Sequence, residues 1–295
     1  GCLAEAWPRP GGTFRGTRTQ LQIDDHEKVA GRLMRGAIFN TDGLLIPVAQ
    51  TPARACAKEV PKLMHFIWLG SPLRESHAQN ILGFAEKNPD WAVWLWVDRD
   101  PRNTSEQILA HARFRKAGPV LVRSAVGERR DFRNWDLLVR NSNLGGRSDY
   151  LRYELLYLYG GIYIDTDSIA LQGFDNFDPV FKWPFVVHSC SNIESQNHDD
   201  LTNSIFSAER HSLLMDFILS AVRENCLSYG RCGIFGAGPA AFTAMFLRYG
   251  QTDYLVISQD YLLRLDGEVQ GHNIAYQRCE GNWLSAAHNH TPAYS

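Results

Sequence analysis

Twenty residues near the middle of the chain, SDYLRYELLYLYGGIYIDTD over 148–167, constrain the fold more than any other segment. Leucines and a tyrosine recur at helical spacing, which predicts a short amphipathic helix with Ser148 as its N-cap. A Gly-Gly pair then supplies the positive φ that ends a helix. The β-branched run after the glycines predicts a buried strand over 162–164. The segment therefore places a helix directly before a strand that ends in acidic residues.

The acidic residues at the strand end are Asp165 and Asp167, separated by Thr166. Because side chains alternate along a strand, the two aspartates are expected on the same side. Mg²⁺ and Mn²⁺ prefer oxygen ligands, and Mg²⁺ is typically held by one or two carboxylates together with substrate phosphates. Asp149 and Arg152 lie one helical turn apart and can face the same site. The combination predicts an enzyme that handles a metal-bound sugar nucleotide.

Each half of this pattern also has a plainer explanation. A bare Asp-x-Asp is most often a solvated turn. Asp149 with Arg152, taken alone, is more often an i,i+3 helix pair worth roughly a few tenths of a kcal/mol. Both halves at this spacing, joined by Gly-Gly and a strand, are far more specific than either one.

The pattern SDxxRxxxLxxxGGxYxDxD, matched in full over 148–167, resembles the sugar-binding region of retaining GT-A glycosyltransferases with a DXD motif. That family includes yeast-type α-1,6-mannosyltransferases, vertebrate α-1,4-galactosyl- and α-1,4-N-acetylglucosaminyltransferases, and the glucosylating domains of large clostridial toxins. The resemblance implies that Asp149 and Arg152 grip hydroxyls of the donor sugar. It also implies that Asp165 contacts the sugar or ribose and helps to place the metal, and that Asp167 ligates the metal directly. Asp149, Arg152 and Asp165 are the catalytic residues it implies.

A second block, earlier in the chain, reads as strand, helix and strand. An apolar strand is expected over 63–69 before a Gly-Ser-Pro turn, a helix over 76–87 and a second strand over 93–97. One βαβ unit predicts a parallel sheet, in which ligands bind beyond the carboxyl ends of the strands. Trp68 and Gly70 lie at such an end.

This block resembles the family's first nucleotide-binding strand, IPKxxHxIWxG followed by NPDxxxxxWxD. The resemblance places Trp68 near the nucleobase, where a flat ring can stack, whereas a strand tryptophan without that context belongs to the core. His65 is expected to be a satisfied core histidine. The expected fold class is α/β: a GT-A, Rossmann-like nucleotide-binding fold with a mainly parallel central sheet and flanking helices.

Two later segments extend the resemblance. The family has an Asn-containing segment and a GPxxxT turn, matched here by Asn203 and by Gly238-Pro239, which can equally be an ordinary loop-to-helix entry. Glycines before a helix can offer N–H groups to an anion or a sugar hydroxyl. His288 resembles the family's C-terminal metal-ligating histidine, although the Ser-Trp pair that follows it in the family is missing. The implied donor-binding residues are Trp68, Gly70, Asp149, Arg152, Asp165, Thr166, Asp167, Asn203, Gly238 and Pro239, and the implied metal ligands are Asp165, Asp167 and His288.

Global properties exclude few classes. The net charge of −2 and the isoelectric point near 6.6 give no electrostatic case for nucleic acid. No run approaches the roughly 18 apolar residues of a membrane span, and a removed N-terminal anchor stays open. Basic residues cluster over 113–140, where a solvated helical hairpin is expected and an acceptor-binding face is the minority interpretation. Residues 1–58 are predicted to be a stem or arm, and residues 59–295 the catalytic domain.

Cysteines and sequons bear on the compartment. Of six cysteines, Cys226 and Cys232 bound a short loop that a disulfide can close. Sequons occur at Asn103 and Asn289, the second partly spoiled by Pro292. Together these favour a secretory-pathway lumen, the Golgi, over a secreted effector.

The combined prediction is a metal-dependent, retaining glycosyltransferase that moves a hexose or N-acetylhexosamine to a glycan, glycolipid or protein acceptor. Mn²⁺ or Mg²⁺ is the expected metal, and the expected donor is a UDP- or GDP-sugar. Two alternatives stay open: a secreted bacterial effector that glycosylates a host protein, and a non-catalytic sugar-binding module. The module is disfavoured because a lectin does not need metal-placed aspartates beside a nucleotide-stacking strand.

Overall fold

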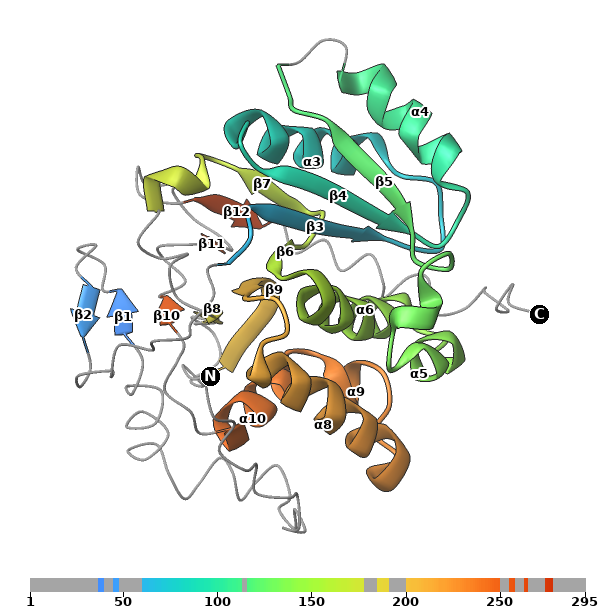
Figure 1. Cartoon of the computed structure of the whole chain (residues 1–295), viewed down its shortest axis with the longest axis vertical. Coiled ribbons are helices and arrows are strands. Elements are labelled where there is room, and N and C mark those ends of the chain that lie inside the picture. The colour runs from blue at the N-terminus through green and yellow to red at the C-terminus, as the bar shows by residue number, and fades with distance from the viewer. Residues whose placement is uncertain are drawn as a thin grey trace, which may run out of the picture.

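The chain forms one large sheet with helices on both faces and one small sheet beside it (Figure 1). This is a computed structural model. It describes residues 37–39, 45–47, 60–112, 116–177, 185–190, 200–249, 255–257, 263–264 and 274–277.

Among the described residues, the large sheet has nine strands in the order β2-β1-β10-β8-β9-β6-β3-β4-β5. Neighbouring strands pair in parallel, except that β9 is antiparallel to both β6 and β8, and β2 is antiparallel to β1. The mainly parallel sheet expected from the sequence is therefore confirmed. The strands are β1 (Ala37–Phe39), β2 (Leu45–Pro47), β3 (Leu63–Trp68), β4 (Ala92–Val97), β5 (Val120–Ser124), β6 (Gly161–Ile164), β8 (Phe185–Cys190), β9 (Asp200–Ala208) and β10 (Leu255–Ile257).

Helices cover both faces of this sheet, and each face has its own apolar core. On one side, α3 (Glu75–Lys87) and α4 (Pro101–Ala112) pack over a cluster that includes Phe66 and Phe84 (Figure 1). On the other side, the cluster includes Trp96 and the apolar side chains of α6. The helices there are α5 (Trp135–Arg140), α6 (Leu144–Tyr159), α8 (Leu213–Tyr229), α9 (Ile234–Ala237) and α10 (Pro239–Tyr249).

The small sheet brings late residues of the chain beside the acidic turn. Its strands are β11 (Leu263–Arg264), β12 (Ala275–Gln277) and β7 (Ser168–Ala170), in that order. β7 begins directly after Asp167 and pairs antiparallel with β12, so that Ser168 lies opposite Gln277. Residues more than 100 positions apart in the sequence therefore share one edge of the site.

The helix before the acidic strand begins earlier than the sequence predicted. Its N-cap is Asn143, whose side chain accepts a hydrogen bond from the Gly146 N–H at 2.9 Å, so Ser148 lies inside α6 rather than at its cap. The predicted end is confirmed, since Gly160 has φ +65° and Gly161 has φ +101°. A Cβ on Gly161 would lie 2.3 Å from the Leu63 carbonyl oxygen, so only glycine fits this turn.

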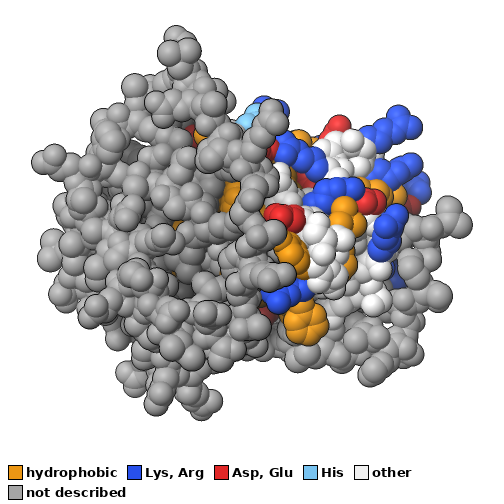
Figure 2. All heavy atoms as spheres, turned by 90° about the horizontal axis from the view of Figure 1, so that it is seen from below, with side chains coloured by type: hydrophobic (Ala, Val, Ile, Leu, Met, Phe, Trp, Pro, Cys, Tyr) orange, Lys and Arg blue, Asp and Glu red, His pale blue; other side chains and the backbone are white. Residues whose placement is uncertain are grey.

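The basic stretch over 113–140 is not a helical hairpin. Its described part holds β5, a short 3₁₀ turn (Arg129–Asp131) and α5. Two arginines in and near it pair with acids across the fold: Arg133 lies 2.5 Å from Asp216, and Arg223 of α8 lies 2.9 Å from Asp136. The face seen in Figure 2 likewise mixes basic, acidic and apolar side chains. These pairs fit the solvated surface that was expected, although the secondary structure differs.

His65 is the core histidine that the sequence suggested. It is fully buried, its Nε2 lies 2.9 Å from the Gly160 carbonyl oxygen, and its Nδ1 accepts from the Trp96 indole N–H at 3.1 Å. Burial lowers the pKa of His65 to about 4. The ring is therefore neutral at pH 7 and joins the start of β6 to β3 and β4.

Glu154 is a buried acid of α6 whose role is structural. Its Oε1 accepts from the Asn134 N–H at 2.7 Å, which ties α6 to the start of α5. Burial raises the pKa of Glu154 from 4.5 to about 7. The folded chain therefore holds this proton more tightly than the unfolded chain, and stability is lost as the pH rises from about 4.5 to 7.

Glu154→Gln is therefore expected to raise the free energy of unfolding at pH 8 by roughly 1–3 kcal/mol, since the amide carries no charge to bury. At pH 4, where the native carboxyl is already neutral, little change is expected. Urea unfolding at both pH values measures the difference. An equal effect at pH 4 and pH 8 would contradict the buried-charge explanation.

The remaining predictions concern the disulfide, the N-terminal segment, two C-terminal residues and a membrane-spanning helix. Cys226 and Cys232 form the expected disulfide, with their Cα atoms 4.3 Å apart. The strands β1 and β2 come from the segment 1–58, so that segment contributes to the large sheet, and its boundary with a catalytic domain stays a prediction. His288 and Asn289 lie outside the described residues. No helix within the described part of the chain has the length and apolar character needed to cross a membrane.

Candidate functional site

The acidic turn lies at the carboxyl end of β6, where the sequence placed it. The Asp165 N–H donates to the Ser204 carbonyl at 2.8 Å, and the Ser168 N–H donates to the Asp165 carbonyl at 3.1 Å. These bonds fix the turn between β9 and β7. The neighbouring strand β3 ends at Trp68 on the same edge of the sheet.

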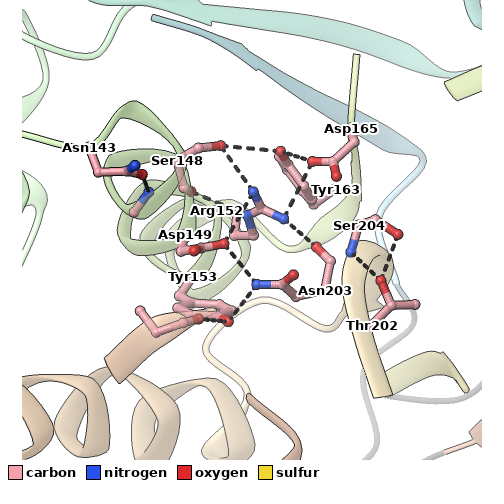
Figure 3. A network of polar contacts seen from close by, with 12 residues as sticks. Asn143, Ser148, Asp149, Arg152, Tyr153, Tyr163, Asp165, Thr202, Asn203 and Ser204 are labelled. Carbon is pink, nitrogen blue, oxygen red and sulfur yellow. Dashed lines mark hydrogen bonds and ion pairs between the residues drawn. The ribbon is translucent and has the colours of Figure 1, made fainter. Parts of the chain in front are cut away.

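The two charged residues of α6 reach this turn, as expected. Arg152 lies 3.3 Å from Asp149 and 3.4 Å from Asp165, and these three side chains converge in Figure 3. The side chains of Asp149 and Arg152 are only 5% and 7% exposed, so the pair is no solvated helix pair. The Arg152 guanidinium therefore links α6 to the carboxyl end of β6.

Asn203 completes this cluster from β9. Its amide donates to Asp149 at 2.9 Å and to the Tyr153 hydroxyl at 3.0 Å, and its backbone carbonyl accepts from Arg152 at 2.6 Å. Tyr153 in turn donates to the Ala237 carbonyl at 2.6 Å, which carries the network to α9. The structure thus brings Asn203 into the cluster with Asp149 and Arg152, and its role in donor binding stays a prediction.

Two tyrosines that the sequence reasoning missed hold the cluster in place. Tyr163 donates to Asp165 at 2.6 Å, and the Arg152 guanidinium carbon lies 4.3 Å from the centre of the Tyr163 ring. Tyr153 packs one turn after Asp149 on α6. Two signals were available: Tyr163 is two residues before Asp165 on a strand, and Tyr153 is four residues after Asp149 on a helix.

Burial dominates the electrostatics of this cluster. It raises the pKa of Asp149 to about 7, with Arg152 and the Asn203 hydrogen bond acting in the opposite direction. Burial also raises the pKa of Asp165 to about 6; Arg152 opposes this, and the nearby charge of Asp167 adds to it. Burial disfavours the charged form of Arg152 as well, but the groups around it hold its pKa above the ordinary value. A cation bound beside these carboxylates would favour their ionised forms.

Thr166 faces away from the carboxylates. Its Oγ1 lies 3.1 Å from His77 Nδ1, and its carbonyl accepts from the Asn80 amide at 2.9 Å. Both partners are buried on α3. Thr166 therefore anchors the turn to α3, and its implied role in donor binding stays a prediction.

Trp68 lies half-buried at the end of β3. Its indole N–H is shared between the carbonyls of Ser71 and Pro72, at 2.9 and 3.1 Å, and its ring lies 4.4 Å from that of His77. Gly70, with φ +81°, donates its N–H to both carboxylate oxygens of Asp98, at 3.0 and 3.1 Å. These contacts hold a flat ring at the strand end, where a base can stack.

If Trp68 stacks on the base, Trp68→Ala is expected to weaken binding of the free nucleoside diphosphate by roughly 1–3 kcal/mol. Calorimetry measures the affinity directly. Trp94→Ala is the matched control. Trp94 is also half-buried, but on β4 it lies opposite His65, which precedes Trp68 by three residues on β3. Equal affinities in wild type and a folded Trp68→Ala variant would show that Trp68 packs as a core residue and does not stack on the base.

Gly238-Pro239 joins α9 to α10 close to the network. The Gly238 N–H donates to the Ile234 carbonyl at 2.9 Å, so this amide is already used within the protein, as in an ordinary loop-to-helix entry. Thr243, the last residue of the GPxxxT pattern, accepts from the Leu201 N–H at 2.8 Å and so ties α10 to β9. A direct contact of Gly238 or Pro239 with a ligand stays a prediction.

The aspartates of the turn have the chemistry for a hard divalent cation. One amide nitrogen, that of Gln277, lies 3.3 Å from Asp165 Oδ2 and 3.3 Å from Asp167 Oδ1, so both carboxylates reach one point. Within the described residues, no group of three or more His, Cys, Asp and Glu residues could hold a metal. Two carboxylates that reach one point fit the kind of Mg²⁺ site that substrate phosphates complete. The ligand role of His288 stays a prediction.

Comparison with known proteins assigns this region. Residues 74–180 match the family model described as the glycosyltransferase sugar-binding region containing a DXD motif. This part of the chain is therefore similar to the sugar-binding region of DXD glycosyltransferases. The matched range includes α3, α6, the Asp165–Asp167 turn and β7, which together form most of the cluster described above.

Three known proteins are similar to parts of this chain. The chain is 31% identical over 118 residues to "Subversion of eukaryotic traffic protein A" of Legionella pneumophila (strain Philadelphia 1), an alignment covering 39% of this chain and 18% of that protein. It thus spans about a fifth of that relative. The structure resembles the PaToxG glycosyltransferase (TM-score 0.52, 19% identity, 65% of this chain and 70% of that chain). Mouse xyloside xylosyltransferase 1 is also similar (TM-score 0.49, 14% identity, 74% and 97%). The fold is that of GT-A glycosyltransferases, as expected.

Proposed function

We propose that this chain transfers a sugar from a nucleotide-diphosphate sugar, with a divalent metal bound at Asp165 and Asp167 and with retention of the anomeric configuration. The observation that carries the proposal is the position of Arg152. Its guanidinium contacts Asp149 and Asp165 at once, so the buried helix pair and the acidic turn form one site. A solvated turn and a separate helix pair would not meet in this way.

Each side chain has a defined task in this proposal. Asp149 accepts from hydroxyls of the donor sugar, and Asn203 holds that carboxylate in place through its amide at 2.9 Å. Arg152 donates to the donor sugar, so that the reacting bond is oriented for attack. Trp68 stacks on the base. A bound Mn²⁺ or Mg²⁺ would neutralise charge that develops on the departing diphosphate.

The donor is identified by screening. The full chain is incubated with Mn²⁺ and a panel of UDP- and GDP-linked hexoses and N-acetylhexosamines, and released sugar and nucleoside diphosphate are quantified. Slow hydrolysis of at least one donor is expected, and NMR of the released sugar reports whether the configuration is retained. A chain that hydrolyses no donor and binds no nucleoside diphosphate would refute the transferase and favour a sugar-binding module.

The biological setting is a second proposal with two candidates. The Cys226–Cys232 disulfide supports an oxidising compartment such as the Golgi lumen. The match to a Legionella protein named for the subversion of eukaryotic traffic supports an effector that glycosylates a host protein. Non-reducing peptide mapping of the chain from its native source separates the candidates. A formed disulfide and a glycan on Asn103, which lies exposed on α4, support the lumen, and free thiols support the effector.

A further inference from the structure

One amide side chain stands between the two carboxylates of the acidic turn. Gln277, on β12, places its Nε2 3.3 Å from Asp165 Oδ2 and 3.3 Å from Asp167 Oδ1. The residue is only 8% exposed, and its backbone is fixed opposite Ser168, the residue that directly follows the turn. The neutral amide nitrogen of Gln277 therefore lies within reach of both the Asp165 and the Asp167 carboxylates.

The other oxygen of Asp165 is already committed to the protein. Asp165 Oδ1 accepts from the Tyr163 hydroxyl at 2.6 Å and lies 3.4 Å from Arg152. The carboxylate is therefore held with Oδ2 turned toward Gln277 and Asp167. This orientation makes Oδ2 the oxygen that is directed at a shared cation.

The spacing of these atoms suits an octahedral ion. Ligands on neighbouring corners of an octahedron with metal–oxygen bonds near 2.1 Å are about 3 Å apart. The terminal atom of Gln277 lies 3.3 Å from each carboxylate oxygen, close to that spacing. A half-turn of the amide exchanges Nε2 for Oε1 at nearly the same point, because the two ends of an amide have nearly the same shape.

We propose that Gln277 is a third protein ligand of the metal: without metal its amide nitrogen bridges Asp165 and Asp167, and with metal its amide oxygen coordinates. The inference rests on the proposed function, since it assumes that the acidic turn binds a divalent cation. It adds a neutral oxygen ligand from a strand more than 100 residues beyond the turn.

The test is Mn²⁺ affinity of the metal-stripped full chain without nucleotide, read from the electron paramagnetic resonance signal of free Mn²⁺. Gln277→Met is expected to weaken binding by roughly tenfold or more. Gln277→Glu, which offers an oxygen without a turn, is expected to bind at least as tightly as wild type. Gln172→Met is the matched control: it removes an amide at the other end of β12, where the Gln172 N–H lies 3.3 Å from the Ile274 carbonyl, and wild-type affinity is expected.

Circular dichroism in chelator first confirms that each variant is folded. Wild-type or tighter Mn²⁺ affinity in Gln277→Met would overturn the inference, as would weaker affinity in Gln277→Glu. Asp167→Ala separates this failure from that of the proposed function. If Asp167→Ala loses Mn²⁺ and Gln277→Met does not, the inference alone fails; if Asp167→Ala keeps wild-type affinity, the metal site itself is refuted.

Discussion

Asp167→Ala is expected to abolish sugar transfer while leaving the fold intact. Asp167 is half-buried in a turn whose backbone is held by Ser204 and by the start of β7, so removing its carboxylate leaves those bonds in place. What is lost is the ligand that holds the cation against the diphosphate, and with it the neutralisation of leaving-group charge. Turnover of the donor found by screening, with circular dichroism as the check on folding, measures the effect.

Asp165→Asn is a second variant that tests the metal site. It keeps the shape of a side chain that contacts Tyr163 and Arg152, but it removes the charge. Loss of transfer is again expected, together with weaker Mn²⁺ binding. Asp175→Ala is the matched control, because Asp175 is an exposed acid 3.1 Å from Lys62, which lies at the start of β3, whereas the turn lies at the carboxyl ends of the strands. Normal turnover in both Asp165→Asn and Asp167→Ala would contradict the metal assignment.

Arg152→Ala and Asp149→Asn are each expected to reduce kcat/KM by at least about tenfold, while the nucleoside diphosphate still binds. A charged hydrogen bond lost in a buried site costs roughly 1.5–3 kcal/mol, and one factor of ten in rate corresponds to about 1.4 kcal/mol. Both residues are assigned to the sugar and its orientation rather than to the base. Parallel measurement of kcat/KM and of diphosphate affinity therefore separates a loss of sugar grip from a general loss of binding.

The Arg152→Ala and Asp149→Asn variants need a control for folding, because removing one partner of a buried ion pair destabilises a protein. Arg223→Ala breaks the ion pair with Asp136 at 2.9 Å, at a half-exposed position on α8 outside the proposed site. It is expected to keep normal turnover. A simple helix pair at Asp149 and Arg152 predicts a small stability loss and near-normal turnover in their variants as well, and that result would defeat the proposed geometry.

The sequence was most informative where one segment holds its own determinants. The helix, the glycine turn and the strand over 148–167 are contiguous, so their periodicity and the two positive-φ glycines predicted the elements and the position of the acidic turn. The spacing of Asp149 and Arg152 on one helix likewise predicted that they face one site. The βαβ unit over 63–97 followed from the same local reasoning.

Features that depend on long-range pairing could not be read in this way. Gln277 meets the carboxylates only because β12 pairs with β7, and no local pattern in the sequence indicates that pairing. His77 and Asn80 hold Thr166 from a helix 86–89 residues earlier, although the helix itself was predicted. The N-cap was misplaced because Asn143 and Ser148 are both good caps, and only the packing of the first turn decides between them.

Reversible metal dependence of the wild-type chain tests the central claim most directly. The chain is stripped with EDTA, hydrolysis of the identified donor is followed by ³¹P NMR, and Mn²⁺ is then added in excess over the chelator. The proposed site predicts no release of nucleoside diphosphate in EDTA and full recovery with Mn²⁺, because Asp165 and Asp167 then hold the cation that the leaving diphosphate requires. Undiminished hydrolysis in chelator would contradict it.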